Sequence, residues 1–155
     1  MLNVPHIPVL RQDVSDLLDI QPDDRCLDGT IGFGGHSENV LSQLTGSGHL
    51  VGIDRDPAAI SFCQNRFNSQ SDRLTLVHSE FADIASLLPT LPVDQFDKIL
   101  LDLGLSSLQL DSPERGFSFE GNGPLDMRMQ PDSPTSAADI LASYSKDELA
   151  HIFQT

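Results

Sequence analysis

Acidic side chains and glycines gather where apolar runs of the chain end. The first run leads into residues 28–36 (DGTIGFGGH), the second into 54–56 (DRD), and the last into Asp102. Glycines let the chain turn sharply and let a ligand approach backbone N–H groups at the start of a helix. The spacing differs from the GxGxxG of dinucleotide-binding loops. The pattern therefore predicts a ligand-binding loop, with a tight turn built for packing as the alternative.

The acidic residues indicate which ligand such a loop would take. Asp28 supplies a negative charge and no pyrophosphate fingerprint follows it, which favours a cationic nucleoside carrying an amino acid, such as S-adenosylmethionine. Asp54 ends the second run, where an acid accepts hydrogen bonds from ribose hydroxyls in folds of this kind. A solvated loop acid is the alternative for Asp54. A metal-binding DxD is disfavoured, because Asp56 is explained as an N-cap before Pro57.

Two more positions could belong to the same site. Phe81 could flank an adenine or could begin a core stripe, and local pattern does not separate the two. Asp102 ends the fourth run, and ligands of open α/β sheets bind beyond the carboxyl ends of the strands. Asp28, Asp54 and Asp102 are therefore expected to line one cleft. The segment 104–107 lacks the GxSxG spacing of a hydrolase nucleophile.

The elements that must position these residues follow from hydrophobic spacing. Helices are expected over 11–19, 36–44, 57–67 and 81–88, and strands over 25–29, 49–53, 73–78 and 97–103. Strands that alternate with helices predict βαβ units, and right-handed crossovers make the parallel sheet doubly wound. The strand over 97–103 is apolar enough to be buried on both faces.

The texture of the chain changes after residue 110. Residues 111–134 are rich in Asp, Ser, Pro and Gly, so a boundary is expected between 1–110 and 111–155. Capping-box signatures at 136–139 and 145–148 then open two helices. The chain ends inside the second of these helices after only four predicted strands, which is typical of part of a longer protein.

Arginine and aromatic residues are interleaved in the irregular segment. Arg115, Phe117 and Phe119, followed by Arg128, could bind phosphates and stack an unpaired base. A surface loop with anchoring side chains is favoured from the pattern alone. The formal charge of −14 argues against non-specific polyanion binding. The five histidines lack metal-ligand spacing, so no metal site is expected.

Composition limits the compartment and the class of the protein. The 155 residues, 39% of them hydrophobic, can build an ordinary core. Cys26 and Cys63 lie in apolar runs without CxxC spacing, which predicts buried, reduced thiols in a cytosolic compartment. No apolar stretch predicts a membrane span or a signal peptide.

Taken together, several motifs resemble one family. In chain order they lie at 6–10 (HIPVL), 28–37 (DGTIGFGGHS), 54–57 (DRDP), 101–111 (LDLGLSSLQLD), 114–119 (ERGFSF) and 123–129 (GPLDMRM). The sequence resembles the RsmH/MraW family, the bacterial methyltransferases that modify the exocyclic N4 amine of a cytosine in small-subunit (16S) ribosomal RNA. The resemblance runs almost from end to end.

The resemblance implies a class I S-adenosylmethionine-dependent methyltransferase fold, Rossmann-like and doubly wound. An inserted helical domain would begin with 111–155. Family members are longer, so the later strands and a basic carboxyl-terminal part would lie outside this chain. The partner would be small-subunit ribosomal RNA or the small ribosomal subunit. The implied cofactor contacts, to which the loop pattern adds Asp28 and Gly32, are Gly34, Gly35, His36, Asp54, Phe81, Asp102 and Gln109.

The expected chemistry needs mainly placement. Asp102 is expected to accept hydrogen bonds from the cytosine amine and to hold it in line with the methyl group. The candidates for substrate binding are Ser106, Arg115, Phe117, Phe119 and Arg128. An NAD-dependent oxidoreductase, disfavoured by the missing GxGxxG, and an inactive fragment or interaction module are the alternatives. A homodimer formed through the exposed sheet edge is left open.

Overall fold

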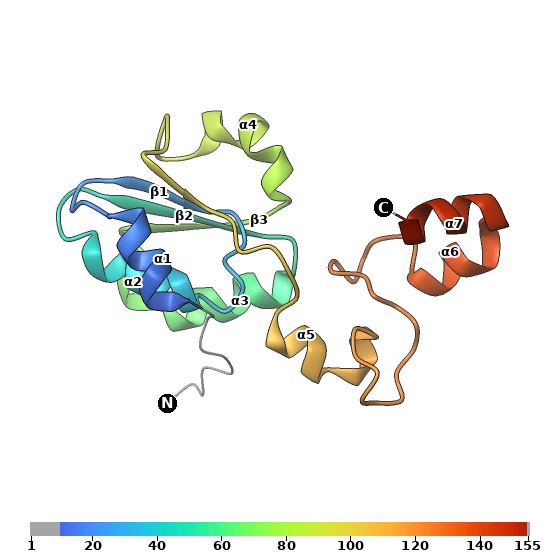
Figure 1. Ribbon diagram of the computed structural model, residues 1–155. Helices are drawn as coiled ribbons and strands as arrows, with labels where there is room; N and C mark the ends of the chain where they lie inside the picture. Colours follow the sequence, from blue (N-terminus) through green and yellow to red (C-terminus); the bar gives the residue numbers. More distant parts are fainter. Residues whose placement is uncertain (1–9, 155) are drawn as a thin grey trace. The chain divides into compact units, whose positions relative to one another are not determined.

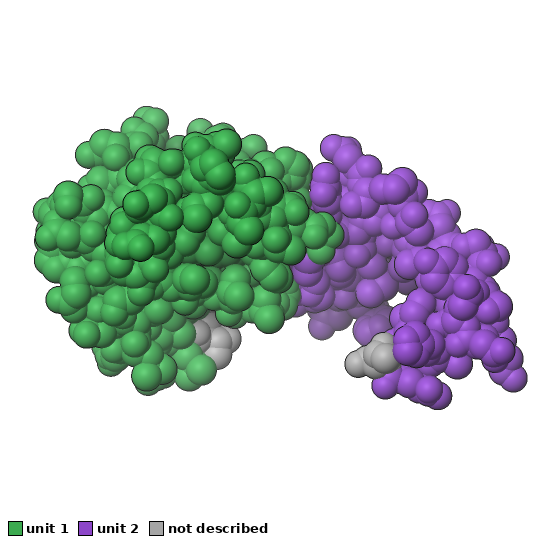
Figure 2. Space-filling model, turned by 90° about the horizontal axis from the view of Figure 1, so that it is seen from above, with its two compact units in different colours: residues 1–104 green, residues 105–155 purple. Residues whose placement is uncertain are grey.

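The computed structural model describes residues 10–154. Most of the 6–10 motif therefore lies outside the described residues. The contacts of the chain divide it into two compact units, Met1–Gly104 and Leu105–Thr155 (Figure 2). This division falls a few residues before the boundary expected at residue 110.

The first unit is built on a four-stranded sheet in the order β3-β2-β1-β4. Its strands, all parallel, are β1 (Arg25–Asp28), β2 (His49–Asp54), β3 (Leu74–His78) and β4 (Lys98–Leu100). Register places Asp28 opposite Gly52 and Leu100, and Asp54 opposite His78. Since the strands run the same way, their carboxyl ends meet at one edge of the sheet, and that edge carries the acids picked out from the sequence.

Helices cover both faces of this sheet. The helices α1 (Arg11–Leu18), α2 (Gly35–Gln43) and α3 (Pro57–Arg66) lie on one face, and α4 (Ile84–Leu87) lies on the other (Figure 1). Short 3-10 turns follow α3 and flank α4, at Asn68–Gln70, Phe81–Asp83 and Leu88–Thr90. The expected doubly wound α/β arrangement is confirmed.

Two layers of core hold the central strands. On the side of α2 and α3, Cys26 and Leu50 pack with Leu41 and Leu44. On the side of α4, the alternate strand residues Leu27, Val51 and Ile53 are buried. Successive side chains of a strand point to opposite faces, so burial on both sides makes a slip in register costly. The carboxyl ends of β1 and β2 are therefore held in a fixed position.

The expectation for the fourth strand was wrong. A strand over 97–103 buried on both faces was expected, but β4 is short, and Ile99 and Leu101 are 57% and 45% exposed. The reason is topological: β4 is the last strand of the described sheet and pairs only with β1. An apolar run predicts a strand, but it does not show whether other elements cover both faces of that strand.

The second unit contains short helices joined by an irregular segment. They are α5 (Ser107–Asp111), the turn Pro113–Arg115, α6 (Ala137–Ser143) and α7 (Lys146–Gln154). Both expected capping boxes are confirmed. Ser136 N donates to Asp139 Oδ2 at 2.9 Å and Asp139 N donates to Ser136 Oγ at 3.2 Å. Ser145 and Glu148 exchange the same pair of bonds. Within residues 10–154, no helix has the length and apolar character needed to cross a membrane.

Candidate ligand site at the carboxyl edge of the sheet

Asp28 is a buried carboxylate at the end of β1. It is 2% exposed, Ser37 Oγ donates to its Oδ2 at 2.6 Å, and Thr30 N donates to its Oδ1 at 3.2 Å. Burial raises the pKa of Asp28 to about 6, although both hydrogen bonds act to lower it. Asp28 therefore clamps the end of β1 to the start of α2. Its expected part as a charge partner for a cationic ligand stays a prediction.

Asp54 ties the end of β2 to the glycine loop. Its Oδ2 accepts from Gly32 N at 2.8 Å and its Oδ1 accepts from Asp56 N at 2.8 Å. Burial raises the pKa of Asp54, and the two backbone hydrogen bonds oppose that rise. A carboxylate has about four lone-pair sites, so both oxygens keep capacity for a ligand. Asp56 caps α3 by accepting from Ala58 N at 2.9 Å, as expected from its place before Pro57.

The glycine loop has a backbone that favours glycine. Gly32 and Gly34 have φ of 50° and 74°, both in the left-handed region. Gly34 is the N-cap of α2. A Cβ on Gly34 would overlap the ring of Phe67, and Cys63 Sγ donates to Gly32 O at 3.3 Å. Cys63 and Phe67, at the end of α3, therefore pack against the glycine loop.

Arg66 holds the same loop through another carbonyl. Its Nη1 donates to Phe33 O at 2.6 Å, and its Nη2 lies 2.9 Å from Glu38 Oε1 on α2. Glu38 also pairs with Arg11 at 2.7 Å. Sequence reasoning assigned Arg66 no role. The i, i+3, i+4 spacing of residues 63, 66 and 67, which puts them on one side of α3, is the signal that could have found it.

His36 and Asp102 approach each other across the edge. His36, at the start of α2, is 9% exposed, and its Nε2 lies 3.6 Å from Asp102 Oδ2. The Asp102 side chain is 64% exposed. Burial lowers the pKa of His36 and the charge of Asp102 opposes that change. Asp102 N donates to Thr30 Oγ1 at 2.7 Å, which connects Asp102 to the residues around Asp28.

Asp28 and Asp54 end β1 and β2 and Asp102 follows β4, but the three acids differ in their exposure to solvent. Asp28 is sealed, Asp54 is partly buried and Asp102 is open to solvent. Phe81 follows β3 and is 42% exposed. Its Cβ lies 3.1 Å from the place that a Cβ on Gly29 would occupy. Phe81 therefore packs beside the β1 loop and leaves part of its ring open.

In the second unit, Ser106 and Gln109 cap α5. Ser106 N donates to Gln109 Oε1 at 3.0 Å, and Gln109 N donates to Ser106 Oγ at 3.3 Å. Sequence reasoning missed this capping box, although the SxxQ spacing displays it. Their expected parts in substrate and cofactor binding stay predictions.

The arginines of the irregular segment are used within it. Arg115 Nη2 donates to the carbonyl of Arg128 at 3.1 Å, and its guanidinium lies 6.0 Å from the ring centre of Phe117. Arg128 pairs with Asp126 at 2.6 Å. Phe119 is fully exposed. These contacts favour the surface-loop interpretation, and binding of RNA by these residues stays a prediction.

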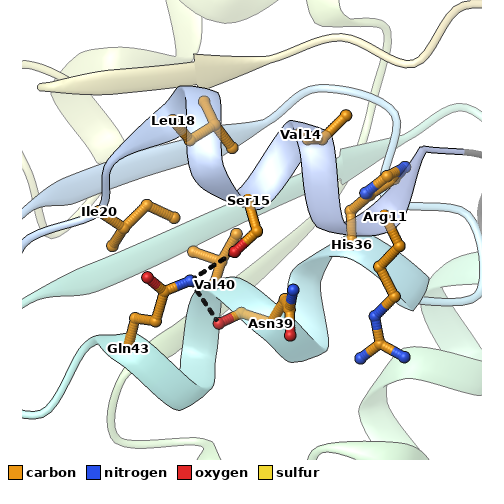
Figure 3. Close-up of a pocket in the computed structure, with 9 residues that line it drawn as sticks. All are labelled: Arg11, Val14, Ser15, Leu18, Ile20, His36, Asn39, Val40 and Gln43. Atoms are coloured by element: carbon orange, nitrogen blue, oxygen red, sulfur yellow. Dashed lines mark hydrogen bonds between the residues drawn. The ribbon is translucent and has the colours of Figure 1, made fainter.

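A small pocket between α1 and α2 lies beside this site (Figure 3). His36 and Arg11 line one end of it, and Gln43 lines the other. Gln43 Nε2 donates to Ser15 Oγ at 3.0 Å and to the carbonyl of Asn39 at 3.3 Å. The pocket is therefore a gap in helix packing that is closed at one end by the hydrogen bonds of Gln43. Within residues 10–154, no three His, Cys, Asp or Glu side chains are grouped to hold a metal ion.

Comparisons with known proteins identify relatives of the whole chain. A model of the MraW methylase family matches residues 3–155. A Mycoplasma pneumoniae protein named ribosomal RNA small subunit methyltransferase H is 48% identical over 153 residues, which are 98% of this chain and 49% of that protein. A Heliobacterium mobile protein of the same name is 44% identical over 148 residues, which are 95% and 47%. The chain therefore spans about half the length of these curated relatives.

A solved structure shows the same fold. Aeropyrum pernix fibrillarin, in complex with natively bound S-adenosyl-L-methionine, matches with a TM-score of 0.51 at 13% identity over 68% of this chain and 44% of fibrillarin. At that identity the likeness concerns the fold alone, which is the class I methyltransferase fold expected from the resemblance. Because the family model matches residues 3–155, which are nearly all of the sequence, the chain belongs to the MraW methylase family.

Proposed function

We propose that this chain supplies the S-adenosylmethionine-binding part of a methyltransferase that modifies the N4 amine of a cytosine in small-subunit ribosomal RNA. The observation that carries the proposal is the position of Asp54. This acid ends β2, and its carboxylate oxygens accept hydrogen bonds from Gly32 N of the glycine loop and from Asp56 N. The names of the relatives support ribosomal RNA as the substrate. The choice of cytosine N4 rests on the resemblance of the motifs.

The residues of the edge fit the cofactor in chemistry. Asp54 retains lone pairs for the two ribose hydroxyls, and Phe81 offers an exposed ring surface to an adenine. The left-handed backbone of Gly32 and Gly34 brings main chain rather than side chains to the ligand side of the loop. When bound, the cofactor supplies an electrophilic methyl group on a positively charged sulfur. Acids around that position favour the cation.

Asp102 is the residue of this chain best placed to meet the substrate. Cytosine N4 is a weak nucleophile because its lone pair is delocalised into the ring. A carboxylate that accepts a hydrogen bond from the amine orients it and favours the positive charge that develops on nitrogen. The exposed side chain of Asp102 can accept this hydrogen bond, while its Oδ2 lies 3.6 Å from His36 Nε2. The target base must be unpaired or flipped out to reach Asp102.

Binding of the cofactor tests the proposal directly. We expect the 155-residue chain to bind S-adenosylmethionine in a calorimetric titration, with competition by S-adenosylhomocysteine and none by NAD. Binding of NAD in its place would support the oxidoreductase alternative. Absence of heat with either ligand would support the other alternative, an inactive fragment or interaction module.

Asp54→Asn is expected to weaken S-adenosylmethionine binding by about 10- to 100-fold. The amide turns one acceptor oxygen into a donor, so Gly32 N or Asp56 N loses its acceptor and the loop loosens. An unsatisfied donor costs about 1–3 kcal/mol, which covers that range. The measurement is the calorimetric Kd. The control is Asp72→Asn, an exposed position with the same change in charge. Equal Kd values for the two variants would contradict a role for Asp54.

A further inference from the structure

Thr30 connects the ends of β1 and β4 beyond the point where their main-chain hydrogen bonds stop. The last main-chain contact between them runs from Gly29 N to Leu100 O at 3.0 Å. Asp102 lies beyond the end of β4. There the hydroxyl of Thr30 accepts from Asp102 N at 2.7 Å, while Thr30 N donates to Asp28 Oδ1 at 3.2 Å. The position of Asp102 is therefore tied to β1 through one threonine side chain.

A second path returns from Asp102 to Asp28. Asp102 Oδ2 lies 3.6 Å from His36 Nε2. The next residue, Ser37, donates from Oγ to Asp28 Oδ2 at 2.6 Å. Together the contacts form a closed ring that runs through Asp28, Thr30, Asp102, His36 and Ser37. The ends of β1 and β4 and the start of α2 therefore cannot shift independently.

We propose that Thr30 is a positioning residue that fixes Asp102 against His36 at the mouth of the candidate site. Its β-branched side chain has a restricted χ1, so the hydroxyl is held in place for the Asp102 N–H. Asp102, with an exposed side chain, has little packing of its own to fix it. The consequence for cofactor binding rests on the proposed function, whereas the geometric claim does not.

His36 reports whether Asp102 is in place. The charged groups that act on its ring come from two elements: Asp102 after β4 raises the pKa of His36, and Arg11 on α1 lowers it. Glu38 on α2 is itself paired with Arg11. If Asp102 moves away, its contribution is lost and the pKa of His36 falls. A threonine that served only to satisfy a backbone N–H would leave this pKa unchanged.

The experiment is an NMR titration of the histidine rings in the unliganded 155-residue chain. Thr30→Val, which keeps the shape and removes the hydroxyl, is expected to lower the pKa of His36, and Thr30→Ser is expected to restore it. Asp102→Asn should lower it as well. The matched control is Thr75→Val, which removes a hydroxyl 2.9 Å from His49 Nε2 and should leave His36 unchanged.

Two results of the titration would overturn the proposed role of Thr30. An unchanged pKa of His36 in Thr30→Val overturns the proposal if Asp102→Asn lowers it, because the pair then forms without Thr30. An unchanged value in both variants overturns it too, since Asp102 then has no influence on His36. Thr30→Ala, which also lacks the hydroxyl, replaces Thr30→Val if the valine does not fold.

Cofactor binding separates this proposal from the proposed function. We expect Thr30→Val to bind S-adenosylmethionine about tenfold more weakly than the unmodified chain, and Thr30→Ser to bind nearly as well as that chain. If the unmodified chain does not bind, the proposed function fails and the titration still decides the geometry. If Thr30→Val binds as tightly as the unmodified chain, the positioning of Asp102 has no part in binding.

Discussion

Gly34→Ala will destabilise the first unit by about 2–5 kcal/mol and remove most of its binding of S-adenosylmethionine. Gly34 has φ of 74°, and an alanine in the left-handed region costs about 1–2 kcal/mol. The new Cβ would also overlap the ring of Phe67, and overpacking of this kind costs about 1–3 kcal/mol. Domains have about 5–15 kcal/mol to lose, so the variant can fold but with a displaced loop. Urea unfolding measures the first effect and calorimetry the second.

Gly32→Ala is the control for stability because it has the conformational cost alone. Its φ is 50°, and the nearest atom to a new Cβ is Thr30 O at 3.9 Å. We expect a loss of about 1–2 kcal/mol for this variant. Combining Gly34→Ala with Phe67→Leu should give a favourable coupling energy, because the smaller side chain yields space. Equal losses for the two alanine variants would show that Phe67 does not shape the loop.

The central elements were predictable from sequence because each is covered on both sides by the described chain. Cys26 and Leu27 point to opposite faces of β1, and each meets a core cluster. The apolar run is then a sufficient signal. The same signal was misleading for β4. Ile99 is as apolar as its counterparts but lies at an edge, and no local pattern tells an edge strand from a central one.

The positions of the candidate site residues could be predicted from the sequence better than the contacts that these residues make. Asp54 and Asp102 could be located because acids that follow parallel strands share one edge. The sealing of Asp28 could not be foreseen, since it depends on Ser37 folding back from α2. Likewise, the contacts of Arg66 and Phe67 with the loop join segments that are remote in sequence. The SxxQ cap of α5, by contrast, was legible locally and was overlooked.

Stability of the chain should fall with rising pH because of Asp28, and Asp28→Asn should remove that part of the dependence. Burial raises the pKa of Asp28 from 3.8 to about 6, so folding favours the protonated carboxyl. The contribution is therefore fully present below the unfolded pKa and is lost as pH rises through about 6. The difference between the two pKa values corresponds to about 3 kcal/mol, most of it lost between pH 3.5 and 7.5.

The measurement is urea unfolding of the unmodified chain and Asp28→Asn at several pH values away from the pI of about 4.3. Relative to the variant, the unmodified chain should become less stable by about 3 kcal/mol across that range, with roughly half of the change above pH 5. Taking the difference cancels groups such as Asp97, whose pKa is lowered by Arg25 and which acts in the opposite direction. Ser37→Ala should move the transition to higher pH, because the bond that favours the charged carboxylate is gone. A pH-independent difference would mean that Asp28 has the same pKa in the folded and the unfolded chain, so that burial does not favour its protonated form.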